Sequence, residues 1–398
     1  MYAFRKPFTA GVYLDIYLWG LEYKTVLVFA QVAGYTISKF LGIKYISELK
    51  AVNRVRYIFA LVGVSWLALL FFAIVPHPFN WPFLILNGLP LGMIWGVVFS
   101  FLEGRKNTDL LAAGLASSFI VASGFVKSIG KYLVIEGISE FWMPFFTGAI
   151  FIPSLCLGVF LLSIIPPPSE DDISDRTARR AMNSTERKAF FLSFAPGIVM
   201  ITLIYMALTA YRDFRDNFAV EIWTDLGYGE SPEVLTLSEI PIAITVLILS
   251  SLTILIKNHR KGFYINLLSI HIGGILAIVS TALFQFGIIG PLLWMIAVGF
   301  AMYLPYMYYN TVFFERWLAF FKYSANIGFL IYICDSFGYL SSLGVMLFRD
   351  LFFRDLGWVN FFIKITYGMG FIGLAFAILS LLYFLKRERS IPRPATDG

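Results

Sequence analysis

The chain has few charged residues for its length. Only 14% of its 398 residues are Asp, Glu, Lys or Arg, whereas about 25% is usual in soluble domains. Hydrophobic residues make up 59% of the chain, which is more than a water-soluble core accommodates. This composition excludes a soluble enzyme, a nucleic-acid-binding domain and a secreted disulfide scaffold. It indicates a protein that resides in a lipid bilayer.

Residue types that hold metals or carry out catalysis are also scarce. The two cysteines, Cys156 and Cys334, lie far apart in separate apolar runs, so neither a disulfide nor a thiolate metal site is expected. The three histidines lack metal-ligand spacing, and the sequence has no glycine-rich phosphate loop or dinucleotide-binding motif. We therefore expect no cofactor and no enzymatic activity.

Long apolar segments account for most of the hydrophobic residues. A helix of roughly 20 apolar residues crosses a bilayer, whereas a barrel strand needs only about 10 residues that alternate with polar ones. The segments are too long and too uniformly apolar for strands, so the sequence predicts an all-α membrane protein with about eleven full spans. They are residues 25–43, 57–76, 82–102, 110–133, 142–165, 190–211, 237–256, 263–286, 291–313, 323–347 and 359–385.

The loops between these segments differ in charge. One set of loops contains twenty Lys and Arg residues, and the opposite set contains five. Because Lys and Arg accumulate in cytoplasmic loops, the first set is predicted to be cytoplasmic, in a multi-pass protein of the cell inner membrane. The long polar loop 166–189 would then be a cytoplasmic linker between helix bundles 1–165 and 190–386. Residues 387–398 would form a cytoplasmic tail.

A weak internal repeat relates the two predicted bundles. A shift of 207 residues places Arg5 on Arg212, and a shift of 209 places Pro82 on Pro291. Repeats that preserve order and spacing indicate duplicated structural units. The sequence therefore predicts six helices plus six, with residues 1–10 as the outer half of a truncated first helix.

A chain with two parallel six-helix halves and a long cytoplasmic linker resembles the major facilitator superfamily. Within it, the start of the chain is similar to the organophosphate:phosphate antiporters, although Ser123 stands near the place of their substrate-binding histidine. The resemblance implies a monomeric secondary transporter of small organic anions, which include phosphate esters. It is carried by Tyr2, Arg5, Lys6, Phe8, Gly11, Gly34, Tyr35, Ser38, Lys39, Phe40, Asn87, Gly88, Gly92, Met93 and Trp95.

Arg5 and Arg212 are the leading candidates for substrate binding. An arginine within the bilayer costs about 2.5–3.5 kcal/mol on insertion scales, so it needs a partner or a ligand. The resemblance implies that both face the central cavity, where guanidinium groups suit a phosphate or carboxylate. Lys39, one turn beyond Tyr35, would add a positive charge. Alternatively, Arg5 reaches the outer interface and Arg212 begins an outer loop.

Tyr303, Tyr306 and Asn310 are spaced by three and four residues, so they share one helix face. This face is predicted to contact the organic part of the substrate. An interfacial aromatic belt or internal packing explains the tyrosines almost as well.

Gly88 and Gly92, with Gly96 one turn further on, repeat every four residues. This spacing is typical of a helix that packs closely on another, because glycine lets two backbones approach. We therefore predict helix packing here rather than substrate contact.

Four further charged residues lie in apolar segments. Lys127 or Lys131 is expected to approach Glu239 at the outer side of the bundle, either as a structural ion pair or as a gate. Asp335 is predicted to be a proton site or to pair with Lys39.

Together these patterns predict a transporter that moves a small organic anion by alternating access. Two other functions fit the same patterns: a non-transporting sensor of this fold, and a proton-coupled exporter of a neutral or cationic compound that uses Asp335. The only partners expected are the substrate and the lipid bilayer.

The truncated first helix leads to the first prediction. An upstream start would supply the missing half-helix, so the native protein should have an intact mass above the 45.0 kDa of a chain that begins at Met1. Mass spectrometry of the protein from its natural source measures this. A native mass that corresponds to Met1 as first residue would contradict the prediction.

Overall fold

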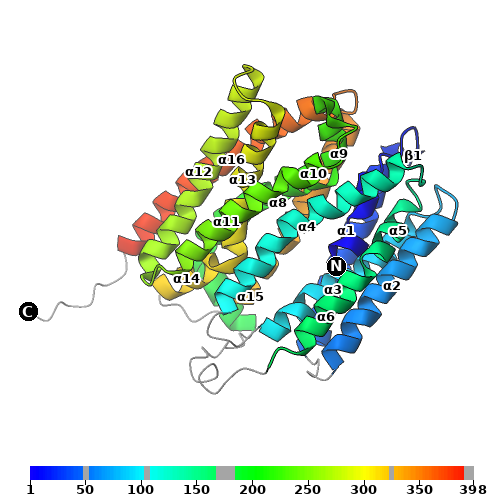
Figure 1. Ribbon diagram of the computed structural model, residues 1–398. Coiled ribbons are helices and arrows are strands. Elements are labelled where there is room, and N and C mark those ends of the chain that lie inside the picture. The colour runs from blue at the N-terminus through cyan, green and yellow to red at the C-terminus, as the bar shows by residue number, and fades with distance from the viewer. Residues whose placement is uncertain (48–52, 103–107, 167–183, 322–326, 390–398) are drawn as a thin grey trace, which may run out of the picture. The chain divides into compact units, whose positions relative to one another are not determined.

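The computed structural model describes residues 1–47, 53–102, 108–166, 184–321 and 327–389, and these are almost entirely helical (Figure 1). Within these ranges the only strands are β1 (Tyr17–Leu18) and β2 (Leu21–Glu22), which pair in an antiparallel hairpin. The predicted all-α class is confirmed.

The helices before the central linker cover the first five predicted spans. Long uninterrupted apolar runs form them because a helix satisfies every backbone hydrogen bond within one segment. They are α1 (Tyr23–Ser47), α2 (Arg54–Ile74), α3 (Pro82–Leu102), α4 (Thr108–Ile135), α5 (Met143–Ile150) and α6 (Ile152–Ser163).

The helices after the linker cover the remaining six predicted spans. They include short helices between the long ones, and η4 is a π-helical turn. The elements are α8 (Ser184–Asn217), α9 (Ala219–Trp223), η4 (Thr224–Tyr228), α10 (Val234–Leu237), α11 (Glu239–Ile254), α12 (His259–Gln285), α13 (Pro291–Thr311), α14 (Phe313–Phe320), α15 (Ile327–Phe352) and α16 (Trp358–Arg389).

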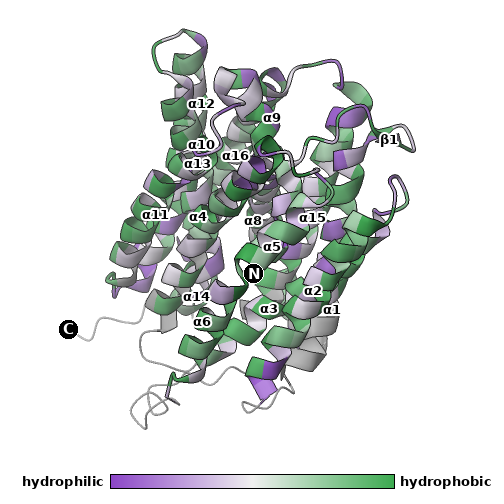
Figure 2. Ribbon diagram, turned by 45° about the vertical axis from the view of Figure 1, so that its right-hand side comes forward, coloured by the Kyte–Doolittle hydropathy of each residue, from purple (hydrophilic) through white to green (hydrophobic). Residues whose placement is uncertain are grey.

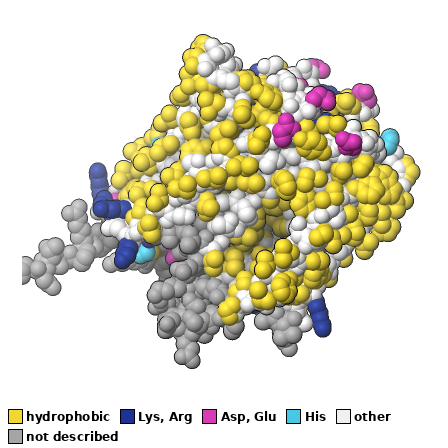
Figure 3. Space-filling model, in the orientation of Figure 1, with side chains coloured by type: hydrophobic (Ala, Val, Ile, Leu, Met, Phe, Trp, Pro, Cys, Tyr) yellow, Lys and Arg dark blue, Asp and Glu magenta, His cyan; other side chains and the backbone are white. Residues whose placement is uncertain are grey.

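The lengths and composition of these helices fit a membrane protein. Eight helices among the described residues are long and apolar enough to cross a bilayer, and the pair α5 and α6, bent by 45°, would be a ninth span. Hydrophobic residues cover the helices, while hydrophilic residues concentrate at helix ends and in loops (Figure 2). Large apolar side chains such as Leu67, Ile244 and Leu382 are more than half exposed, as expected for surfaces that face lipid (Figure 3).

Residues 1–10 differ from the sequence prediction. They form two 3₁₀ turns, η1 (Tyr2–Phe4) and η2 (Pro7–Ala10), and not the outer half of an α-helix. Pro7 begins the second turn and has no backbone N–H to donate, so one helical hydrogen bond is missing at this point.

The described chain divides into two compact units. Unit 1 comprises Met1–Arg176, Asp213–Ile244 and Leu343–Phe362, and unit 2 comprises the remainder. Unit 1 therefore contains α1 to α6 together with segments from the second half of the sequence. The division into bundles 1–165 and 190–386 stays a prediction, and most of the linker 166–189 and the tail 387–398 lies outside the described residues.

Glycines set the close contact of α1 with α3 in unit 1. A Cβ atom added to Gly34 would lie 2.1 Å from the carbonyl oxygen of Ile85, and one added to Gly88 would lie 2.2 Å from that of Gln31. Gly92 is similarly close to Ser38. The predicted packing role of Gly88 and Gly92 is confirmed.

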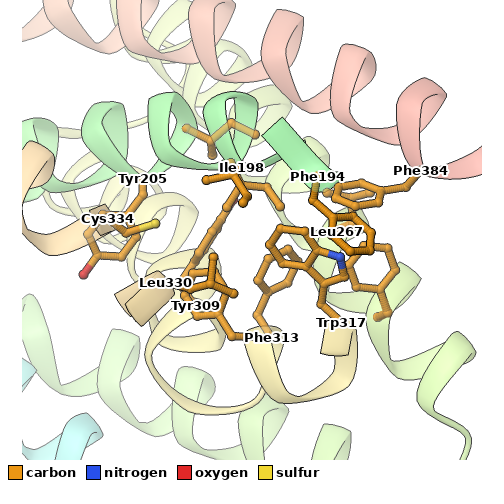
Figure 4. Packing of buried hydrophobic residues seen from close by; sticks show 14 of the residues in the cluster. Phe194, Ile198, Tyr205, Leu267, Tyr309, Phe313, Trp317, Leu330, Cys334 and Phe384 are labelled. Atoms are coloured by element: carbon orange, nitrogen blue, oxygen red, sulfur yellow. The ribbon is translucent and has the colours of Figure 1, made fainter. Parts of the chain in front are cut away.

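Aromatic side chains form the core of unit 2. Trp317 and Phe263 are fully buried among residues from α8, α12, α14 and α16, and Phe384 packs edge-on against both rings. Figure 4 shows Trp317 and Phe384 within this cluster. Edge-to-face pairs contribute about 0.5–1.5 kcal/mol beyond the area that they bury. This cluster fixes the helices that carry the polar residues of unit 2.

The α1–α3 contact leads to a stability prediction. Gly88→Ala should lower the midpoint of thermal unfolding in detergent, because the added methyl group forces two backbones apart at a cost of about 1–3 kcal/mol. Gly63→Ala is the matched control, since Gly63 lies within α2 and has nothing within 4 Å of an added Cβ. An unfolding midpoint equal in the two variants would contradict close packing at Gly88.

Candidate functional site

Arg5 lies between the two amino-terminal turns of unit 1 and stacks on α1. Its guanidinium carbon is 4.1 Å from the centre of the Tyr35 ring, so the structure brings together two residues predicted for the substrate site. Such a cation–π contact contributes about 0.5–2 kcal/mol. Stacking occupies the face of the guanidinium group and leaves its N–H donors at the edge.

Two amides hold the turn that carries Arg5. The Gln31 side chain donates to the Arg5 carbonyl at 2.8 Å and to Asn87 Oδ1 at 2.7 Å. Asn87 is fully buried and donates to the carbonyls of Phe4 and Ser65, each at 2.9 Å. Because buried amides that make several bonds have one orientation, they fix the position of Arg5 against α1 and α3.

Arg212 has a comparable environment in unit 2. Its guanidinium carbon lies 4.1 Å from the centre of the Tyr306 ring of α13. Asn310, one turn further along α13, donates to the Tyr306 carbonyl at 2.8 Å. The structure thus brings together three of the residues predicted to contact substrate, whereas Tyr303 is only 7% exposed and lies within the packed interior.

Tyr205 connects this group to Asp335, and the sequence analysis missed it. The Tyr205 hydroxyl donates to Asp335 Oδ1 at 2.6 Å, its ring lies 5.5 Å from that of Tyr306, and Asn310 Nδ2 is 3.5 Å from its oxygen. The signal was the seven-residue spacing between Tyr205 and Arg212, which places both on one face of α8.

A buried carboxylate, Asp216, joins two lysines in unit 1. Asp216 forms ion pairs with Lys6 and with Lys127, the latter at 2.7 Å, and it accepts a hydrogen bond from Ser123 at 2.5 Å. Lys6 also donates to Asn217 at 2.8 Å. Both lysines are at most 5% exposed, so Asp216 has two buried cations as partners.

Other buried ion pairs lie in the same unit. Lys24 is 2% exposed and contacts Glu221 at 2.5 Å. Arg215 pairs with Glu239 at 2.6 Å, and Arg349 pairs with Glu22 at 2.5 Å. Each pair joins residues that are distant in sequence, except Arg215 and Glu239, which bracket the short helices α9 and α10.

The predicted pairing of Lys127 with Glu239 is wrong, and the approach of Lys131 to Glu239 stays a prediction. Lys127 pairs with Asp216 instead of Glu239, whose partner is Arg215. Depth along a helix was the basis of the prediction, and it does not determine which of several nearby acids a lysine reaches. Lys131 lies one turn beyond Lys127 and borders Trp223 and Tyr228. The side chain of Lys39 lies outside the described residues.

The chain belongs to the DUF5690 family, a family of unknown function, whose model matches residues 7–387. No curated protein matches the chain in sequence.

Several solved transporter structures share the fold. A D-xylose–proton symporter matches with a TM-score of 0.60 and 14% identity over 95% of this chain and 94% of its own. The nucleoside transporter NupG matches with a TM-score of 0.59 and 13% identity over 96% of each chain. The human organic anion transporter MFSD10 (TETRAN) matches with a TM-score of 0.54 and 13% identity over 89% of this chain and 83% of its own. The fold is therefore that of major facilitator transporters.

The Asp216 cluster leads to the third prediction. Asp216→Asn should lower the unfolding midpoint strongly, because removal of one partner leaves buried charges unpaired at a cost of about 3–5 kcal/mol. The control is Asp225→Asn, which makes the same chemical change at an exposed carboxylate. Differential scanning calorimetry measures both variants. Equal midpoints would show that Asp216 does not hold the two lysines.

Proposed function

We propose that the protein is a secondary transporter that moves a small organic anion by alternating access. The observation that carries the proposal is a pair of stacked arginines: Arg5 on Tyr35 in unit 1, and Arg212 on Tyr306 in unit 2. The two arginines match under the internal repeat of the sequence. The transporter fold supports the same conclusion.

The chemistry of these side chains favours an anion. A guanidinium group remains charged at any physiological pH and offers five donors and no acceptor. Its planar fork can donate two parallel hydrogen bonds to a carboxylate or to a phosphate. Tyr35 and Tyr306 hold the two planes in fixed orientations, so less freedom is lost when an anion binds. Phosphate esters and carboxylates are therefore the substrates to test first.

We assign the buried ion pairs of unit 1 to gating. Lys6 precedes α1, Lys127 lies in α4, and Asp216 lies near the end of α8, so their contacts join the first part of the chain to the second. Alternating access requires such contacts to break and re-form during each cycle. Loop charges suggest that this end faces outward. Arg215 and Glu239 would contribute to the same closure, and Lys131 lies close to it.

The loop charges and the two arginines also support a cellular location and an oligomeric state for the transporter. The excess of Lys and Arg in one set of loops supports an inner-membrane location with the central loop in the cytoplasm. A single chain supplies both arginines, which supports a monomer as the working unit.

The central test is anion binding by purified protein. Thermal-shift screening against phosphate esters, carboxylates, neutral compounds and cations should show stabilisation by an anion, since a ligand that binds the folded state raises its stability. Stabilisation by cations alone would contradict the proposal and favour proton-coupled export.

Arginine variants then locate the site, which is the fourth prediction. Arg5→Lys and Arg212→Lys should each weaken binding of the anion found in the screen by about 2–5 kcal/mol, because lysine lacks the planar fork. Calorimetry measures both variants, with exposed Arg56→Lys as control. Unchanged affinity in either single variant would move the site elsewhere.

A further inference from the structure

We propose that unit 2 carries a binding site for an anionic phospholipid, at the end where α12 begins and α16 ends. We define this basic end by four residues, Lys257, Lys261, Lys386 and Arg389. The inference goes beyond the proposed function, because the lipid would be a bound partner and not the substrate. It depends on neither arginine of the candidate substrate site.

Side-chain contacts hold the start of α12 beside the end of α16. Glu388 of α16 forms an ion pair with Arg260 at 2.5 Å and accepts a hydrogen bond from the Tyr264 hydroxyl at 2.7 Å. Phe263 packs edge-on against Phe384, with 5.0 Å between the ring centres. The cations that flank these residues along the chain therefore lie at one end of unit 2, and Lys and Arg side chains gather there in Figure 3.

Positive charge is in excess at the basic end. Its four residues are exposed, and none of them forms an ion pair with a residue that the structure describes. Glu388 already has Arg260 as its partner, and Glu315 of the neighbouring α14 is followed in sequence by Arg316. Each Lys or Arg near an anionic membrane surface contributes about fivefold in affinity. Four such cations therefore favour an anionic headgroup over a zwitterionic one.

Lys261 lies at the end of an apolar stripe on α12 that faces lipid. Ile265 and Leu268 follow it by four and seven residues, and Ile272 and Ile275 continue the same spacing. Residues at these spacings share one face of a helix. The four apolar side chains are between 39% and 54% exposed, and α12 is long and apolar enough to span a bilayer. Because a lysine at a helix end extends to the headgroup level, Lys261 lies where the headgroup of a lipid on this stripe would be.

The end of α16 has the same arrangement. Leu382 and Leu379 precede Lys386 by four and seven residues and are 58% and 50% exposed, and Arg389 follows Leu382 by seven. Arg387 differs, because its guanidinium carbon lies 5.4 Å from the centre of a core phenylalanine ring. The basic end therefore continues two lipid-facing stripes on neighbouring helices.

This combination of charge and apolar surface favours a lipid over a soluble anion. A soluble phosphate would meet only the cations. A phospholipid places its phosphate at the cations and its acyl chains along the stripes in one molecule. Because linked contacts reinforce each other, the lipid should bind more tightly to the basic end than its headgroup alone.

The fifth prediction concerns lipid selectivity. Native mass spectrometry of the purified full chain in detergent would follow titration with phosphatidylglycerol, and with phosphatidylcholine that carries the same acyl chains. Phosphatidylglycerol should bind saturably and at least about tenfold more tightly, because two cations that contribute about fivefold each are sufficient for that difference. Equal binding of the two lipids would overturn the inference.

Lysine variants assign the selectivity to the basic end. Lys386→Gln should weaken phosphatidylglycerol binding about fivefold, and its combination with Lys261→Gln should weaken it at least about tenfold. Lys364→Gln is the matched control, since it makes the same substitution at an exposed lysine near the opposite end of α16. An equal loss in Lys364→Gln and Lys386→Gln, or no loss in the combined variant, would contradict a site at the basic end.

Soluble glycerol phosphate separates a lipid site from a site for free phosphate. Any binding of glycerol phosphate should be the same in the combined variant as in the unmodified chain, because the substrate site lies elsewhere. If the variant loses glycerol phosphate as strongly as it loses the lipid, the basic end binds soluble phosphates and the lipid inference is wrong. These outcomes leave the proposed function unchanged, since it concerns Arg5 and Arg212.

Discussion

The pairing of Asp216 with two lysines is the interaction on which the arrangement of unit 1 depends. A lysine ammonium group removed from water loses several kcal/mol of solvation, and only a close opposite charge with further hydrogen bonds offsets that loss. The Asp216 carboxylate supplies the opposite charge to both Lys6 and Lys127. The amino-terminal turns, α4 and the end of α8 must therefore lie together, and the contacts of Lys24 and Arg349 add to the same constraint.

That constraint is compatible with the gating that we propose. A buried ion pair contributes little net stability compared with apolar residues of the same size, so a gate built from such pairs would not make opening prohibitive. The arginines are different, because an aromatic ring stabilises each one. A ring packs on one face of a guanidinium group, whose N–H donors lie at the edge of the plane.

The helices were predictable because each is encoded locally. Within the described residues, helices form most of each of the eleven apolar segments, since only an internally bonded segment of that length is stable in lipid. The turns at residues 1–10 were not predicted as 3₁₀, although Pro7 was visible, because the expectation came from a repeat and not from the local backbone chemistry. The hairpin of β1 and β2 has two residues in each strand. Such strands are too short for an alternation of polar and apolar residues to predict them.

The candidate site was predictable in its residues and less so in its contacts. Arg212, Tyr306 and Asn310 were chosen for charge and spacing, and they lie together because spacing along a helix fixes a face. The partner of Lys127 was wrong, and the roles of Asp216 and Tyr205 were missed. Pairing between distant helices depends on rotation and depth together, which one sequence does not specify.

Transport by reconstituted protein tests the central claim most directly. The chain would be placed in sealed vesicles that contain an excess of the unlabelled anion found to bind it, and entry of the same anion in labelled form would be followed. A secondary transporter of organic anions predicts rapid, saturable exchange that is absent from protein-free vesicles and lost in Arg212→Lys. Binding of the anion without exchange would contradict transport and would assign the protein to the sensors of this fold.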